Sequence, residues 1–234
     1  MELCPNNSIK KISAQRDKSE CVLLQLGRVD YQTALTWQKQ LLAGRSAERE
    51  QLDVLMLLEH PPVYTYHRPA DCDQILQDLG GVPLYQVERG GQITYHGPGQ
   101  LVGYPILDLR QHRQDLHWYL RQLEQVLIDA LVHFGVPAKR QAGYTGVWAG
   151  EYKLAAIGVK VSRWVTMQGF ALNVDPDLSA FERIVPCGLT RPVGSLAQFC
   201  PGIGVEEVLP VVAACFGRVF DREMIAGGRQ LLLS

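Results

Sequence analysis

The chain has 234 residues, 47% of them hydrophobic and 20% charged, and its formal net charge is -1. This length suits one globular domain, and the near-zero charge gives no reason to expect electrostatic binding to nucleic acid. No apolar run approaches the ~20 residues of a membrane-spanning helix, so no membrane association is expected. The first 20 residues lack the apolar stretch of a secretory signal. We therefore expect a polar arm at 1–20, a single domain at 21–220 and a C-terminal tail at 221–234.

Strand and helix periods recur along most of the chain, and capping residues mark several boundaries. The first half should contain strands at 21–26, 54–58, 63–66 and 84–88, a helix from an N-cap at Asp30 to about Leu42, and a short helix at 71–79. The second half should contain strands at 101–107, 144–149, 152–161 and 164–174, a helix from Asp115 to Phe134, a short helix within 175–182 and a last helix from Val205 to about Phe220. Strands and helices interleave without regular β-α-β units, which is compatible with the α+β class but does not select a fold.

Several positions inside these elements carry further expectations. Pro105 cannot donate to a sheet ladder, so the strand at 101–107 is expected at a sheet edge. Gly158 and Gly169 interrupt strand patterns, which often marks a close approach by a ligand. The segment at 67–68 fits a pocket rim and a solvated loop about equally well. Three histidines around the long helix are expected at the surface or its boundary: His112, His117 and His133.

The six cysteines are scattered at positions 4, 21, 72, 187, 200 and 215. None forms a Cys-x-x-Cys pair and no His-Glu-x-x-His motif is present, so we expect neither a metal site nor a disulfide framework. Unpaired cysteines favour a reducing compartment, the cytoplasm. Cys215 lies among apolar residues and should be a core thiol. Cys187, between Pro186 and Gly188, lies in a sharply turning segment that favours exposure.

The stretch RGGQITYHGPGQ, which begins at Arg89, concentrates residues suited to a ligand-binding loop. Its glycines at 90, 91, 97 and 99 permit positive φ and a close backbone approach, while Arg89 and His96 supply polar groups. An alternative is a plain hairpin with a solvated arginine and a turn-capping histidine, but the density of special residues argues against it. The Walker and Gly-x-Gly-x-x-Gly patterns of nucleotide loops are absent.

Together with three other stretches, this segment resembles the octanoyltransferases of lipoate biosynthesis. The other stretches are EHPPVYT from Glu59, KLAAIGVKV from Lys153 followed by GFALN from Gly169, and the Pro-Cys-Gly of 186–188. Many family members carry a histidine before the GFALN stretch, whereas this chain has Gln168, to which no role is assigned. The resemblance covers most of the chain from about Cys21 to Phe220.

The resemblance implies the α+β fold of biotin and lipoate protein ligases, a mixed, largely antiparallel sheet with packed helices. It makes 21–220 a catalytic acyltransferase domain that needs no cofactor. The implied reaction moves an octanoyl group from octanoyl-acyl carrier protein to a lysine of lipoyl domains, such as those of 2-oxoacid dehydrogenases and the glycine cleavage H protein.

The resemblance also implies roles for individual residues. Cys187 would be the nucleophile and Lys153 the residue that activates it. A free cysteine is only a few per cent thiolate at neutral pH, and a nearby ammonium raises that fraction. The substrate pocket would be lined by Arg89, Gly90, Gly91, Gln92, Ile93, Thr94, Tyr95, His96, Ala156, Ile157, Gly158, Gly169, Phe170 and Ala171. Whether His96 orients the acyl group or holds the loop is left open.

Two alternative functions stay open at this point. An ATP-dependent lipoate or biotin ligase of the same fold would activate its acid as an adenylate and would need no cysteine, so Cys187 argues against it. The second alternative is a non-catalytic protein that binds acyl carrier protein or lipoyl domains.

Overall fold

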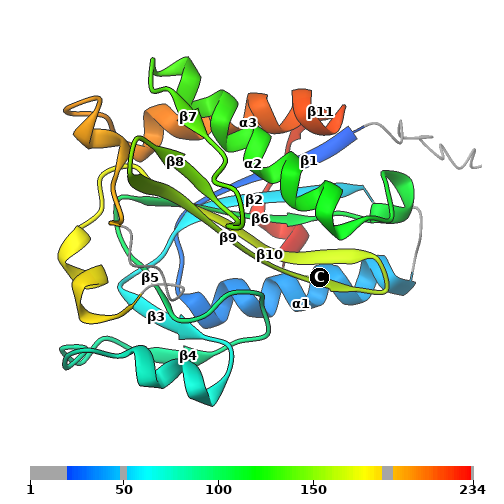
Figure 1. Ribbon diagram of the computed structural model, residues 1–234. Helices are drawn as coiled ribbons and strands as arrows, with labels where there is room; N and C mark the ends of the chain where they lie inside the picture. Colours follow the sequence, from blue (N-terminus) through cyan, green and yellow to red (C-terminus); the bar gives the residue numbers. More distant parts are fainter. Residues whose placement is uncertain (1–19, 48–51, 186–191, 233–234) are drawn as a thin grey trace, which may run out of the picture.

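The computed structural model describes residues 20–47, 52–185 and 192–232, which build two sheets and the helices that cover them (Figure 1). The large sheet has eight strands in the order β11-β1-β2-β6-β10-β9-β8-β7, and the small sheet has the order β4-β3-β5. The strands are β1 Glu20–Arg28, β2 Asp53–Glu59, β3 Val63–Tyr66, β4 Leu84–Gln86, β5 Thr94–His96, β6 Gln100–Ile106, β7 Ala138–Lys139, β8 Val147–Ala149, β9 Tyr152–Ser162, β10 Val165–Asn173 and β11 Glu223–Ala226. The α-helices are α1 Tyr31–Ala47, α2 Leu116–His133 and α3 Val205–Phe220.

Helices cover both faces of the large sheet (Figure 1). α2 and α3 pack on one face, where Leu127 and Phe216 contribute to the larger core cluster. α1 packs on the other face, over a second cluster that includes Met56 and Tyr104. Because β2 is buried on both faces, its sequence is a continuous apolar run rather than an alternating one.

The small sheet lies on the α1 side of the large sheet, below it in Figure 1, and has a core of its own. Tyr64 of β3 and Tyr95 of β5 pack in this core with Phe181 from the segment after β10. The chain leaves β4 and reaches β5 through the glycine-rich loop, which contacts β9. The glycine-rich loop therefore links the small sheet to the large one.

The predicted fold class is confirmed. Only the β1–β2 and β1–β11 pairs of the large sheet are parallel among the described strands, so the sheet is mixed and largely antiparallel. The two predicted N-caps are also confirmed: the Asp30 carboxylate accepts from the backbone N–H of Thr33 at 3.1 Å, and that of Asp115 accepts from Trp118 at 3.0 Å. α1 continues to Ala47, beyond the predicted end near Leu42.

The edge position predicted from Pro105 is wrong. β6 lies inside the sheet, between β2 and β10. The regular β6–β10 pairs end at Gly103, and Pro105 lies beyond them. There the Thr166 hydroxyl donates to the Pro105 carbonyl at 2.7 Å and accepts from the Leu107 N–H at 2.9 Å. The Thr166 side chain thus replaces the backbone hydrogen bonds between β6 and β10 at the position where proline lacks an N–H donor.

His112 lies at the boundary of the surface, within the prediction, but its side chain points inward. Its side chain is 4% exposed, and its Nε2 lies 2.7 Å from an oxygen of the buried Asp53 carboxylate. The same carboxylate pairs with Arg45 from α1 and with Arg222, which precedes β11. Side chains from three segments, Arg45, His112 and Arg222, thus converge on one buried carboxylate.

Two shorter segments also differ from the sequence prediction. Instead of a helix at 71–79, a 3-10 helix spans Pro69–Gln74, and it begins early because the Asp71 carboxylate accepts from the backbone N–H groups of His67 and Arg68. Within the predicted tail, β11 pairs in parallel with β1. None of the helices in the described ranges is long and apolar enough to cross a membrane.

Candidate active site

The candidate site lies where β9 loses its second neighbour in the sheet. β8 pairs with β9 only as far as Ala155, and the glycine-rich loop then takes over, with the Gly90 N–H donating to the Val159 carbonyl at 3.0 Å. A Cβ at Gly158 would lie 2.7 Å from the Gly90 oxygen, and one at Gly169 would collide with the Gly103 carbonyl. The sequence predicted a close approach by a ligand at these two glycines, whereas in the structure the closest approach to each is made by protein backbone.

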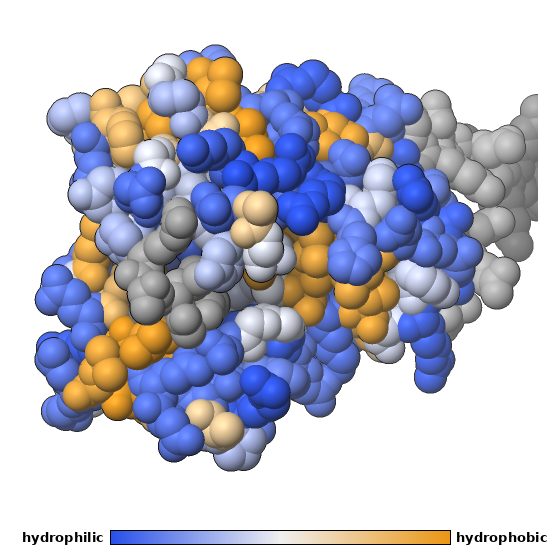
Figure 2. Space-filling view, in the orientation of Figure 1, coloured by the Kyte–Doolittle hydropathy of each residue, from blue (hydrophilic) through white to orange (hydrophobic). Residues whose placement is uncertain are grey.

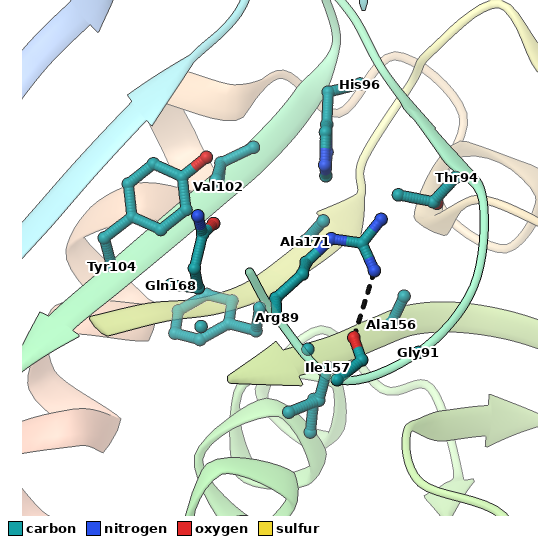
Figure 3. Close-up of a pocket in the computed structure, with 14 residues that line it drawn as sticks. Arg89, Gly91, Thr94, His96, Val102, Tyr104, Ala156, Ile157, Gln168 and Ala171 are labelled. Carbon is teal, nitrogen blue, oxygen red and sulfur yellow. Dashed lines mark hydrogen bonds between the residues drawn. The ribbon is translucent and has the colours of Figure 1, made fainter. Parts of the chain in front are cut away.

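A pocket with about 410 Å³ of empty space, part of it open to solvent, lies between this loop, β5 and strands β6, β10 and β9 (Figure 3). It brings together most of the predicted lining residues, namely Arg89, Gly90, Gly91, Thr94, His96, Ala156, Ile157, Gly158, Gly169, Phe170 and Ala171. Three predicted residues do not line it. Ile93 and Tyr95 point into the core of the small sheet, since successive strand residues face opposite sides, and Gln92 also lies outside the lining. We call this space the acyl pocket, after the substrate that the sequence resemblance implies.

The acyl pocket also has lining residues to which the sequence assigned no role: Val102, Tyr104 and Gln168. Val102 and Tyr104 belong to the alternating pattern of β6, which predicted a buried face but not a pocket. Gln168 has a positive φ of 59°, and its side-chain amide bonds the Tyr31 hydroxyl, with its oxygen at 3.4 Å. A glutamine thus closes the pocket at the position where the sequence departs from the family pattern.

Arg89 extends across the acyl pocket (Figure 3) and is 7% exposed. Its Nη2 donates to the carbonyl and hydroxyl oxygens of Thr65 at 3.0 and 2.8 Å, and its Nη1 donates to the Gly90 carbonyl at 3.0 Å. Its buried Nε has no hydrogen-bond partner among the described residues. Arg89 therefore ties the glycine-rich loop to β3 and places a positive charge at the pocket.

His96 is neutral and held in one orientation. Its Nδ1 lies 2.7 Å from Gln100 Oε1, and Gln100 Nε2 donates to Asn173 Oδ1 at 2.9 Å. Because the amide nitrogen is already a donor, its oxygen accepts and His96 Nδ1 carries the proton. Burial lowers the pKa of His96 to about 3, with a further contribution from His60. The ring points into the pocket with an unprotonated Nε2 (Figure 3).

His60 is a second neutral histidine behind the pocket wall. Its Nδ1 lies 2.7 Å from the Val29 carbonyl, which can only accept, so Nδ1 donates. Its Nε2 then accepts from the Tyr104 hydroxyl at 2.8 Å. Burial lowers the pKa of His60 to about 4. The wall near Tyr104 is therefore polar but uncharged.

Lys153 is buried, with 8% of its surface exposed, although a lysine at a strand end is usually solvated. The stem of its side chain passes Gly146, where a Cβ would lie 2.9 Å from Lys153 Cε, and its Nζ lies 5.4 Å from the centre of the Trp148 ring. Its backbone N–H donates to the Pro192 carbonyl, and its carbonyl accepts from the Gly194 N–H, both at 3.0 Å.

Lys153 adjoins the acyl pocket. A second space of about 320 Å³, also partly open to solvent, is lined by Lys153, Gln100 and Asn173 and shares Thr94 and Ala156 with the acyl pocket. The hydrogen-bonded chain from His96 through Gln100 to Asn173 therefore leads toward the lysine.

Cys187 lies outside the described residues, as do Pro186 and Gly188. The described chain is hydrogen-bonded on both sides of them, and on the C-terminal side it lies beside Lys153. Before them, the Val185 N–H donates to the Gln74 carbonyl at 2.8 Å. After them, the chain at 192–194 runs beside Lys153, and Asn173 Nδ2 donates to the Gly194 carbonyl at 2.9 Å.

The side chains of the segment at 67–68 bond within their own loop or to the chain beside it. His67 Nδ1 lies 3.1 Å from the Val87 carbonyl, and Arg68 faces the Asp71 carboxylate at 3.8 Å. Neither residue lines the acyl pocket or the space beside Lys153.

Comparison of the sequence with known proteins identifies the family of this chain. Residues 30–217 match the family model described as the lipoyl protein ligase A/B catalytic domain. An octanoyltransferase of Gloeobacter violaceus is 64% identical over 214 residues, which cover 92% of this chain and 96% of that protein. An octanoyltransferase of Nostoc punctiforme is 54% identical over 208 residues, which cover 88% and 90% of the two chains.

Solved structures share the fold at low sequence identity. A putative lipoate protein ligase from T. acidophilum superposes with a TM-score of 0.75 at 16% identity, over 92% of each chain. A biotin protein ligase from Aquifex aeolicus, in complex with biotin and ATP, superposes with a TM-score of 0.52 at 16% identity, over 86% of this chain and 70% of that one. The likeness to biotin and lipoate protein ligases predicted from the sequence is confirmed at the level of the fold.

Proposed function

This chain belongs to the octanoyltransferases of the lipoyl protein ligase A/B catalytic domain family and is an acyltransferase, and from this premise we propose that it transfers the octanoyl group through a thioester on Cys187. The donor is octanoyl-acyl carrier protein. The acceptor is a lysine of a lipoyl domain, as in 2-oxoacid dehydrogenases or the glycine cleavage H protein. A reducing cytoplasm suits the reaction because it keeps the thiol free.

One observation carries the proposal: a buried lysine lies beside the acyl pocket, at the point where the segment containing Cys187 rejoins the described chain. Burying an ammonium costs free energy, so a protein rarely retains one without a use. An ammonium near the thiol stabilises the thiolate, which is the nucleophilic form of cysteine.

In the first step, the Cys187 thiolate attacks the carbonyl carbon of the donor thioester. A new carbon–sulfur bond forms, the bond to the pantetheine sulfur breaks, and the pantetheine thiolate takes a proton from Lys153. One thioester is exchanged for another, so this step lies near balance. Backbone N–H groups of the glycine-rich loop stabilise the oxyanion.

In the second step, Lys153 is neutral and takes a proton from the acceptor ammonium. The free amine attacks the carbonyl carbon of the acyl-enzyme and a carbon–nitrogen bond forms. The carbon–sulfur bond then breaks, Cys187 leaves as the thiolate, and the nitrogen releases its second proton to solvent to give the amide. An amide is more stable than a thioester, so the transfer proceeds without ATP.

During both steps the octanoyl chain occupies the acyl pocket. Val102, Ile157 and Ala171 provide apolar surface, and each methylene that leaves water contributes ~0.8 kcal/mol. The neutral state of His96 suits this role, because a charged imidazolium would oppose burial of an alkyl chain.

The test is incubation of the purified protein with octanoyl-acyl carrier protein, without ATP, followed by intact mass spectrometry. The wild type should gain one octanoyl group and Cys187→Ala none. Cys200→Ala is the matched control, since the Cys200 thiol donates to the Phe134 carbonyl at 3.3 Å, away from the pocket, and this variant should acylate normally. Lys153→Ala should acylate slowly, and iodoacetamide should then label Cys187 only at higher pH.

The same experiment separates the alternative functions. If neither wild type nor Cys187→Ala gains the group and transfer requires free octanoate with ATP, the protein is a ligase. If it binds acyl carrier protein and transfers nothing under either condition, it is a non-catalytic binder.

A further inference from the structure

A wide groove reaches Lys153 from the α2 side of the large sheet, and we propose that it receives the phosphopantetheine arm of the donor thioester. This inference rests on the proposed function, because it assigns a path to the part of the donor that the acyl pocket does not hold. We call this space the arm groove.

The arm groove has about 790 Å³ of empty space, including the part open to solvent. Its walls are the first turns of α2, the loop at 143–145 and the side of β9 that faces α2, and its residues include Leu116, Leu120, Tyr144, Val159 and Lys153. Figure 2 shows a hollow near the centre of this face, with hydrophobic surface on its right and hydrophilic surface above.

The arm groove and the acyl pocket meet at the edge of β9. Gly90, Gly91, Ile157 and Gly158 line both. Val159 packs against the core under α2 and lines only the arm groove, Ala156 faces the acyl pocket and the space beside Lys153, and Ile157 lies at the junction. An acyl chain in the acyl pocket with its carbonyl near Lys153 therefore leaves its sulfur toward the arm groove.

The charge of the arm groove favours an uncharged arm over the acceptor lysine. Lys153 supplies the one charged side chain among the described lining residues, and no carboxylate is among them. An incoming lysine ammonium would be partly desolvated there without a carboxylate to compensate its charge among the described lining residues. The pantetheine arm is uncharged along its length, carries amides and methyl groups, and ends in a phosphate.

The walls of the arm groove match these groups. Leu116 and Tyr144 are 43% and 45% exposed, so they present apolar surface to methylene and methyl groups. The hydroxyls of Tyr144 and Thr145 can bond amides.

Arg140 precedes the loop that carries Tyr144 and bonds to α2, the helix that forms one wall of the arm groove. Arg140 and Arg121 both bond the buried Glu124 carboxylate, at 3.0 and 2.6 Å, so two guanidiniums share one negative charge. Their side chains are 36% and 52% exposed, and the excess positive charge complements a phosphate at the outer end of the arm.

The experiment compares a donor that has the arm with one that lacks it. The rate of Cys187 acylation is followed by intact mass with octanoyl-pantetheine 4′-phosphate and, separately, with p-nitrophenyl octanoate. Leu116→Trp fills the arm groove and Tyr144→Ala removes one wall. Each variant should lower the rate with octanoyl-pantetheine 4′-phosphate, divided by the rate with p-nitrophenyl octanoate, about ten-fold. This is the equivalent of ~1.4 kcal/mol of lost arm binding. Val132→Trp, at an exposed position farther along α2, should leave the ratio unchanged.

A binding measurement makes the result independent of the chemistry. Calorimetric titration with the S-methyl thioether of pantetheine 4′-phosphate should show binding to the wild type and weaker binding to Leu116→Trp. If the thioether binds the wild type and binds Leu116→Trp more weakly while neither donor acylates Cys187, the arm groove is supported and the covalent mechanism is wrong. An unchanged rate ratio, or no thioether binding to the wild type, would overturn the inference. So would a Leu116→Trp effect confined to the transfer from acyl-enzyme to lipoyl domain, because the groove would then belong to the acceptor.

Discussion

Acidification should destabilise this protein well before its carboxylates titrate, because His60 and His96 are buried in the neutral form. Burial lowers the pKa of His60 to about 4 and that of His96 to about 3, from an ordinary value of 6.5. Below pH 6.5 the unfolded chain therefore binds protons that the folded chain does not. The stabilisation is complete above pH 6.5 and is lost as the pH falls toward these folded-state values.

The size of the effect follows from the two pKa values. Each pH unit below 6.5 costs ~1.4 kcal/mol per histidine until the folded-state pKa is reached. Between pH 7 and pH 5 each histidine then costs roughly 2 kcal/mol, and the pair ~4 kcal/mol. Since the whole free energy of unfolding of a typical domain is about 5–15 kcal/mol, this loss is easily measured.

Urea unfolding followed by tryptophan fluorescence at pH 7, 6 and 5 provides the measurement. His60→Gln keeps a donor for the Val29 carbonyl and an acceptor for the Tyr104 hydroxyl but does not titrate, so it should halve the pH-dependent loss. His117→Gln changes an exposed histidine and should leave the loss intact. A wild type with constant stability from pH 7 to 5, or a His60→Gln variant with the full wild-type loss, would refute the reasoning.

Two further substitutions test the surroundings of Lys153. Gly146→Ala should slow Cys187 acylation at least ten-fold, measured by intact mass, because φ there is 138° and the new Cβ would lie 2.6 Å from the Ala155 carbonyl oxygen and 2.9 Å from the lysine Cε, so that both must shift. Gly150→Ala, also at positive φ but in open space, should acylate at the wild-type rate. Asn173→Leu leaves the Gly194 carbonyl without its side-chain donor and should cost about 1–3 kcal/mol in urea unfolding; an unchanged unfolding midpoint would show that the bond does not matter.

Much of the secondary structure could be predicted from the sequence, because periodicity and capping are local. The continuous apolar run of β2 and the Asp30 and Asp115 caps are examples. Which strands pair with each other is not a local property. The predicted edge position of the strand with Pro105 was wrong because the Thr166 side chain bonds the Pro105 carbonyl in place of a backbone pair. β11 was missed because four residues are too few for a recognisable alternation.

The candidate site was predictable where it is contiguous in sequence. The glycine-rich loop and the Ala156–Gly158 stretch both line the acyl pocket. Strand alternation turns Tyr95 away from it, a detail that a motif does not contain. Gln168 was missed because its place in the lining depends on a positive φ inside a strand. The roles of Lys153 and Cys187 came from the family resemblance and remain predictions.

The parallel pair of β1 with β11 has a consequence for synthesis of the chain. β1 lies between β2 and β11, so one of its edges stays unpaired until residues 223–226 have left the ribosome. An unpaired strand edge is a template for association with other chains, and contacts across such a separation form slowly. The nascent protein should therefore depend most on chaperones late in translation, when almost the whole sheet exists but its last edge is open.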